Sequence, residues 1–274
     1  MTFRDIRTVG VVGLGAIGGP IAQNIARGGF KVIGFDANPV IRTSLALTIS
    51  MADSAADLAR QCELVIVVVG HERDVEAVLF DDRGVVSGAR DGTIIVISST
   101  VAPRNMERIG TRAKDTQVHL LDAPVARGED AAVAGRLFAF VGGEKEVVAA
   151  AWPVIATFAD TIHHLGGIGA GQIGKIVNSL IFWACISANY EAMKLGQAFG
   201  VDLRALRAAV LESSGQNWAL STNAGEKPAP TAERDMMIIL QEADDLRLSL
   251  PLAGVVKEVI KGIKIERSGA MGGG

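Results

Sequence analysis

Three polar residues share one face of an otherwise apolar segment in the second half of the chain. Lys175, Asn178 and Ser179 are spaced i, i+3 and i+4, which places them side by side on a helix. Polar groups among isoleucine and valine residues are costly unless they line a site or find partners. A lysine in such surroundings loses hydration, so its pKa is expected to fall toward neutrality, as proton transfer requires. The alternative is a solvated lysine in the first helical turn, with Asn178 as an ordinary surface residue.

A second chemical signal lies near the N-terminus, where three glycines follow an apolar run. Gly13, Gly15 and Gly18 come directly after the β-branched segment 8–12 and open a helical pattern. In a dinucleotide-binding turn the first glycine makes the turn, the second admits a pyrophosphate, and the third lets helix and strand pack closely. N–H groups at the helix start then favour the anion. The next strand ends at Asp36, where an acid would meet the adenosine ribose hydroxyls. The alternative is a glycine-rich turn that binds nothing.

Two further polar segments follow predicted strands. The segment 122–128, Asp-Ala-Pro-Val-Ala-Arg-Gly, either presents N–H groups to an anion or is a turn that joins two strands. The hydroxyls of Ser98, Ser99 and Thr100 either reach a ligand or cap the helix that opens at Pro103. From these residues alone, capping is the favoured interpretation.

These residues need a scaffold that brings them to one place, and the hydrophobic pattern predicts it. Short apolar strands alternate with helices up to His164, as in βαβ units around a parallel sheet, which puts the loops after the strands along one edge. The predicted strands are Val9–Val12, Lys31–Phe35, Leu64–Val69, Thr93–Ile97, Gln117–Leu121, Leu137–Val141 and Thr161–His164. The predicted helices between them are Ile17–Arg27, Pro39–Ala46, Arg73–Leu79, Pro103–Ala113 and Lys145–Phe158. The fold class is therefore α/β, with a Rossmann-type dinucleotide-binding domain over residues 1–165.

Residues 166–274 are predicted to form an all-α domain. A long helix over Gln172–Phe199 is expected to stop at Gly200, and Asp202 is expected to cap the helix Leu203–Leu211. Further helices are predicted over Glu233–Asp244 and Leu252–Lys264. The long helix is apolar around most of its circumference, so it should be buried between domains or subunits, which predicts a homo-oligomer through residues 172–199.

Bulk properties exclude several classes of protein. The 274 residues carry a net charge of −3, which gives no argument for nucleic-acid or membrane-surface binding. The longest apolar stretch, Leu180–Ala188, is too short to span a bilayer. The histidines and the cysteines Cys62 and Cys185 fit no metal spacing, and free thiols with no apolar signal segment at the N-terminus predict a cytoplasmic protein without a metal.

Four segments stand in an order that resembles the β-hydroxyacid dehydrogenase family, which includes 3-hydroxyisobutyrate dehydrogenase and tartronate semialdehyde reductase. They are Gly13–Ala22, Ser99–Thr100, Asp122–Val125 and Gly169–Gln172, the last leading to Lys175 and Asn178. The ordered set spans nearly the whole chain and is more specific than any one motif. The resemblance implies an oxidoreductase that interconverts a short, anionic β-hydroxy acid, similar to 3-hydroxyisobutyrate, and its semialdehyde.

The resemblance also implies roles for residues at matching positions. Lys175 matches the catalytic lysine, which exchanges a proton with the substrate oxygen while hydride passes to or from nicotinamide C4. Asp36 matches the acid of NAD-preferring members, and because a carboxylate there repels a 2′-phosphate, NAD rather than NADP is predicted. The predicted substrate contacts are Thr100, Val125, Ala126, Arg127, Gly128, Asn178 and Ser179. The predicted cofactor contacts are Gly13, Leu14, Gly15, Ala16, Ile17, Gly18, Asp36, Val69, Thr100 and Arg234.

Departures from the family pattern concern the substrate rather than the reaction. The segment 122–128 ends Ala-Arg-Gly where the family usually has Ser-Gly-Gly, and some sulfolactaldehyde reductases look similar, with an arginine that serves the anionic tail. Arg127 is expected either to grip a carboxylate or sulfonate or to point to water, so a sulfonate-bearing semialdehyde is an alternative substrate. Ser179 stands for a second asparagine, and Arg234-Asp235 stands for Lys-Asp after a shorter segment, 224–232.

Two other classes share the fold. Imine reductases generally carry aspartate or tyrosine at the lysine position, and binding proteins of this fold can lose the lysine altogether. Lys175 argues against both classes. Turnover of a cyclic imine but of no hydroxy acid would favour the first class, and failure to bind NAD or NADP would favour the second.

Overall fold

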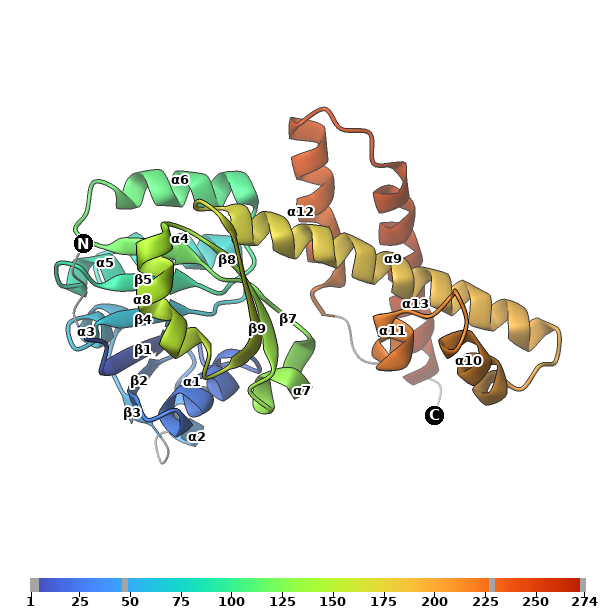
Figure 1. Ribbon diagram of the computed structural model, residues 1–274, viewed down its shortest axis with the longest axis horizontal. Coiled ribbons are helices and arrows are strands. Elements are labelled where there is room, and N and C mark those ends of the chain that lie inside the picture. Colours follow the sequence, from blue (N-terminus) through green and yellow to red (C-terminus); the bar gives the residue numbers. More distant parts are fainter. Residues whose placement is uncertain (1–4, 46–48, 227–229, 272–274) are drawn as a thin grey trace. The chain divides into compact units, whose positions relative to one another are not determined.

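The computed structural model describes residues 5–45, 49–226 and 230–271, and the chain divides into two compact units, residues 1–175 and 176–274 (Figure 1). The N-terminal residues 1–4, the predicted helix end at Ala46, part of the short segment 224–232 and the last three glycines lie outside the described residues.

Over its described residues the first unit is built on a nine-stranded sheet in the order β3-β2-β1-β4-β5-β6-β8-β7, with β9 paired to β8. The strands are β1 (Thr8–Val12), β2 (Lys31–Phe35), β3 (Ser50–Met51), β4 (Leu64–Val67), β5 (Ile94–Ile97), β6 (His119–Asp122), β7 (Val125–Ala126), β8 (Leu137–Gly142) and β9 (Ala159–Gly166). All seven predicted strands are confirmed, with ends that differ by up to two residues.

The prediction of a parallel sheet is correct for β1 to β6 and for the β8–β9 pair, and wrong for the pairs that β6 and β7 form with β8. The strands β6 and β7 each pair with β8 in antiparallel orientation, whereas β9 pairs with β8 in parallel. A parallel crossover needs about a dozen residues or more, and only ten residues separate β7 from β8 (127–136). That short connection, which includes the six-residue helix α7 (Gly128–Val133), therefore leads the chain back in the opposite direction.

Helices cover both faces of this sheet and make three layers (Figure 1). On one face α1 (Gly18–Arg27), α7 and α8 (Lys145–Ile155) pack against residues such as Leu64 and Ile66. On the other face α3 (Ala55–Ala59), α4 (Glu72–Phe80), α5 (Val85–Gly88) and α6 (Pro103–Ala113) pack against the alternate residues, such as Val65 and Val67. Both faces of the inner strands are buried, which explains their continuous apolar runs. The helix α2 (Pro39–Leu45) has no buried residue.

The second unit is helical. The helix α9 (Ala170–Ala198) begins in the first unit and continues through the second, followed by α10 (Leu203–Leu211), α11 (Trp218–Ser221), a 3₁₀ turn (Ala224–Glu226), α12 (Ala232–Asp245) and α13 (Pro251–Met271). The predicted ends at Gly200 and Asp202 are confirmed: Gly200 has φ +75°, and the Asp202 carboxylate accepts the Ala205 N–H at 2.8 Å. The helix α13 runs seven residues past the predicted end at Lys264.

Candidate active site

Within the first unit, the predicted cofactor contacts lie at the edge of the sheet where the parallel strands end. β1 lies between β2 and β4, so the connections leave it in opposite directions and make a topological switch point beside it. Ligands of doubly wound sheets bind in the crevice at such a point, beyond the carboxyl ends of the strands. The Gly13–Gly18 turn follows β1, Asp36 follows β2, Val69 follows β4 and Thr100 follows β5.

The three glycines of this turn have three different surroundings. Gly13 has φ +88°, and a Cβ there would collide with the carbonyl oxygen of Val68. A Cβ on Gly18 would collide with the carbonyl oxygen of Gly13, at the point where α1 packs on β1. At Gly15, by contrast, no atom of the described residues beyond its own chain neighbours lies within 4 Å of the added Cβ. The first and third glycines are therefore needed for packing, whereas the second leaves open space beside the backbone, which fits the close approach of a pyrophosphate.

Asp36 is tied to this turn. Its Oδ2 accepts the Leu14 N–H at 2.7 Å and its Oδ1 accepts the Asn38 N–H at 2.8 Å. The carboxylate is half-buried and keeps free lone pairs, because each oxygen has two. Asp36 therefore fixes the glycine turn against the end of β2 and can still accept further hydrogen bonds.

Asp122, which the sequence analysis did not assign a role, holds the start of α9. It is fully buried, and its Oδ1 accepts the Gly169 N–H at 2.7 Å while its Oδ2 accepts the Gln172 N–H at 2.8 Å. Burial raises the pKa of Asp122 to about 6, although the backbone N–H groups act in the opposite direction. A Cβ on Gly142 or Gly171 would collide with the carboxylate, so both positions must stay glycine.

Gln172 is a second residue that the sequence analysis quoted without a role. Its buried side chain accepts the Val101 N–H at 3.0 Å and donates to the Ser99 carbonyl at 2.9 Å. The Ser99 hydroxyl in turn accepts the Val69 N–H at 2.7 Å. Together with Asp122, these bonds tie the first turn of α9 to the ends of β4, β5 and β6.

Lys175 lies one turn beyond Gln172 on α9 and reaches the segment 122–128. It is half-buried, and its Nζ donates to the Val125 carbonyl of β7 at 2.9 Å. The structure thus brings Lys175 together with one of the predicted substrate contacts, Val125. It also shows that the segment joins two strands, β6 and β7, as one of its two interpretations predicted.

In the second unit, two predicted contact residues converge on a carboxylate that the sequence analysis left without a role. The buried Asp235 accepts the Ser179 hydroxyl at 3.5 Å and the Trp183 indole N–H at 3.4 Å. The Arg234 guanidinium lies 3.4 Å from the same carboxylate. Asn178 lies on α9 one turn after Lys175 and is half-buried.

The side chain of Arg127 folds back on the sheet. It forms an ion pair with Asp160 and donates to the Thr161 hydroxyl at 3.2 Å and to the Arg136 carbonyl at 3.1 Å. Its guanidinium carbon also lies 5.5 Å from the centre of the Phe138 ring. The guanidinium is therefore held by β8, β9 and the residue before β8.

The capping interpretation of residues 98–100 is wrong. The helix α6 begins after Ala102 without a side-chain cap, and the Ala102 N–H is bound by the Glu72 carboxylate at 2.9 Å. Ser99 is used by the backbone of β4 instead. Tertiary partners thus replaced the local cap that the sequence favoured.

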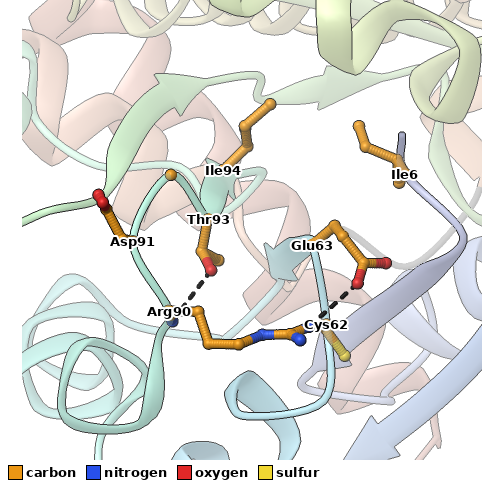
Figure 2. Close-up of a pocket in the computed structure, with 8 residues that line it drawn as sticks. Ile6, Cys62, Glu63, Arg90, Asp91, Thr93 and Ile94 are labelled. Atoms are coloured by element: carbon orange, nitrogen blue, oxygen red, sulfur yellow. Dashed lines mark hydrogen bonds and ion pairs between the residues drawn. The ribbon is translucent and has the colours of Figure 1, made fainter. Parts of the chain in front are cut away.

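Figure 2 shows a small pocket at the opposite edge of the sheet, where β1, β4 and β5 begin. Glu63 accepts the N–H groups of Arg7 and Thr8 and pairs with Arg90 at 3.0 Å. Burial raises the pKa of the Cys62 thiol to about 12, so it is no nucleophile near neutral pH. The contacts around this pocket hold the starts of the strands together, and they lie at the opposite edge of the sheet from the strand ends that carry the predicted site.

Two kinds of site are missing from the part of the chain that the structure describes. No group of three or more His, Cys, Asp or Glu side chains could hold a metal ion. None of the described helices combines the length and the apolar content that a membrane crossing needs.

Known proteins match both units. Residues 8–166 match the family described as the NAD binding domain of 6-phosphogluconate dehydrogenase. Residues 169–271 match the family described as "NAD-binding of NADP-dependent 3-hydroxyisobutyrate dehydrogenase".

Curated relatives and solved structures cover nearly the whole chain. L-threonate dehydrogenase of Cupriavidus necator is 31% identical over 264 residues, which are 92% of this chain and 89% of that protein. 3-Hydroxyisobutyrate dehydrogenase of Pseudomonas aeruginosa is 31% identical over 271 residues, with 92% and 90% covered. The structure of the Mycobacterium tuberculosis 3-hydroxyisobutyrate dehydrogenase with L-serine superposes with a TM-score of 0.83 at 25% identity, covering 93% of each chain.

Proposed function

The chain belongs to the β-hydroxyacid dehydrogenase family of NAD(P)-dependent oxidoreductases, and we propose that its substrate is a short β-hydroxy acid similar to 3-hydroxyisobutyrate. In this proposal the enzyme interconverts that acid and its semialdehyde, with NAD preferred over NADP. The observation that carries the proposal is the Lys175 Nζ beside the Val125 carbonyl, near the carboxyl edge of the sheet. Relatives named for L-threonate, L-serine and 3-hydroxyisobutyrate support a small hydroxylated carboxylic acid.

Residues 1–165 act as the nucleotide-binding domain in this proposal. The Gly13–Gly18 turn receives the pyrophosphate, since it leaves open space beside Gly15 and leads directly into α1, whose N-terminus favours an anion. Asp36 accepts the ribose hydroxyls and disfavours a 2′-phosphate, while Val69, Thr100 and Arg234 complete the cofactor contacts. The bound nicotinamide supplies the hydride donor or acceptor.

Lys175 is the general acid and base. It gives a proton to the carbonyl oxygen when the semialdehyde is reduced, and takes the hydroxyl proton when the acid is oxidised. The ordered start of α9 presents its ammonium group to the segment 122–128, and Asn178 follows on the same helix face. Thr100, Asn178 and Ser179 bind the substrate together with Val125, Ala126 and Gly128 of the segment 122–128.

A panel of β-hydroxy acids and matched sulfonates, followed by NADH absorbance, tests this function. We expect turnover of carboxylates with a hydroxyl on the β carbon, and higher kcat/KM with NAD than with NADP. Equal or better kcat/KM with NADP would contradict the role given to Asp36. Turnover of a cyclic imine alone, or NAD binding without turnover of any hydroxy acid, would contradict the dehydrogenase proposal and favour another class of protein with this fold.

Residues 166–274 serve substrate binding and self-association in this proposal. Ile173, Val177 and Ile181 are spaced i, i+4, i+8 on α9 and are 49%, 53% and 60% exposed in the single chain. A row of large apolar side chains on one helix face is typical of a surface that a second copy covers. Sedimentation at micromolar concentration should show a dimer or larger assembly, and a monomer alone would refute this part.

A further inference from the structure

We propose that Arg127 and Asp160 form a tether that positions the Val125 carbonyl for Lys175, and that Arg127 is a positioning residue rather than the anchor of the substrate anion. This inference rests on the proposed function, because it concerns the lysine that carries it. It gives a role to the arginine that distinguishes this chain from the usual loop pattern.

The guanidinium already has three hydrogen-bond partners, one of them a carboxylate. One terminal nitrogen of Arg127 bonds both the Asp160 carboxylate and the Arg136 carbonyl, and the other bonds the Thr161 hydroxyl. The Thr161 hydroxyl and the Arg127 guanidinium hold the pKa of Asp160 below its usual range, so this carboxylate is ionised at neutral pH. A substrate anion would therefore meet a guanidinium whose positive charge is already paired with an ionised carboxylate.

The backbone conformation at position 127 also indicates that the contacts of the arginine side chain hold this turn. Arg127 has φ +85° and Gly128 has φ +79°, both in the left-handed region that favours glycine. A non-glycine residue persists there when the surrounding contacts hold it. Here the contacts are made by the Arg127 guanidinium, which bonds to the Arg136 carbonyl just before β8 and to the Thr161 hydroxyl in β9.

The tether reaches Lys175 through a very short strand. β7 consists only of Val125 and Ala126, which pair with Ala139 and Phe138 of β8. Such a strand has few ladder hydrogen bonds of its own, so the residue that follows it has a large influence on its position. The Arg127–Asp160 pair therefore fixes the carbonyl that accepts the lysine Nζ two residues earlier.

The test compares Arg127→Ala, Asp160→Asn and the double variant, with Arg108→Ala as the matched control. Arg108 makes a similar exposed ion pair with Glu76, on another face of the unit. If the tether positions Lys175, each single variant should lower kcat roughly tenfold with KM changed less than about twofold, and the double variant should be no worse than either. Arg127→Lys, which keeps the charge without the fork, should restore only part of kcat.

An anion anchor predicts a different pattern. Arg127→Ala would then raise KM for a carboxylate substrate roughly tenfold, whereas Asp160→Asn would free the guanidinium and leave KM unchanged or lower. That result would overturn the proposal. Additive effects of the two single variants would overturn it too.

A second readout needs no turnover. Acylation of Lys175 by an amine reagent, measured by mass spectrometry on the protein without cofactor, should change at least about threefold in Arg127→Ala and Asp160→Asn, and not in Arg108→Ala. Equal rates in all variants would refute the tether. If the unmodified protein turns over no member of the substrate panel, the proposed function fails, while the acylation rates still decide whether the tether positions the lysine.

Discussion

The pH dependence of stability in an Asp122→Asn variant tests how the carboxylate beneath α9 is held. Asp122 is fully buried and accepts two N–H groups at the start of this helix. Burial disfavours the ionised form and the N–H groups favour it, and the balance raises the pKa of Asp122 from 3.8 to about 6. This rise corresponds to about 3 kcal/mol against the ionised form.

The direction in which the stability contributed by Asp122 changes with pH follows from proton linkage. Because the folded pKa of Asp122 exceeds its ordinary value of 3.8, the stability from this group is fully present below that pH and is lost as pH rises through about 6. Asparagine does not titrate in this range. The free energy of unfolding lost on substitution should therefore be larger at pH 4 than at pH 7, by about 2 kcal/mol.

Urea unfolding monitored by circular dichroism at several pH values measures this difference. Hydrogen exchange of the β5 and β6 amides assigns it to the first unit, since the two units need not unfold together. Asp115→Asn, which removes an exposed carboxylate, is the control. A loss that is larger at pH 7 than at pH 4 would show that the N–H groups of α9 outweigh burial, and would refute the reasoning.

Three more predictions concern the proposed chemistry. Lys175→Ala should lower kcat by about two to four decades and leave the affinity for NAD little changed. Steady-state kinetics measures the first effect and calorimetry the second. A variant that loses NAD affinity and keeps its kcat would contradict the role of Lys175 in proton transfer. Gly15→Val should abolish NAD binding with little change in the melting temperature, because its side chain enters space that is open in the protein without cofactor. Gly18→Val should instead lower the melting temperature, because its side chain would collide with the Gly13 carbonyl oxygen. Asp36→Asn should reduce the ratio of kcat/KM with NAD to that with NADP roughly tenfold, and an unchanged ratio would mean that the carboxylate does not face the ribose.

The sequence predicted the buried apolar strands and the longer helices well, and the two-residue strands and the shortest helices poorly. Strands such as β4 and β5 contain enough apolar residues to define a pattern, and α6 is bounded by Pro103 and its own periodicity. The strands β3 and β7 have only two residues each, and the helices α3, α5, α7 and α11 have four to six, less than two turns and too few to show a helical period. The antiparallel direction of β8 depends on the length of a connection rather than on any residue pattern.

The candidate site divides in the same way between local and distant contacts. The glycine turn and the polar face of Lys175 and Asn178 depend on spacings of a few residues, which are visible in the chain. The roles of Asp122 and Gln172 depend on partners 47 to 73 residues away, which no local pattern indicates. The orientation of Arg127 depends likewise on Asp160, on a strand whose pairing was not predicted.

Asp36 and Asp122 show why burial separates a ligand-binding carboxylate from a structural one. Each accepts a backbone N–H from a segment at least 22 residues away and so fixes the start of a turn or helix. Asp122 is fully buried, with Gly142 and Gly171 packed so closely that not even a methyl group fits beside it, so no ligand reaches its oxygens. Asp36 is half-buried at the switch point, and its remaining lone pairs are accessible. Of these two carboxylates, only Asp36 can therefore hold the backbone and recognise a ligand at the same time.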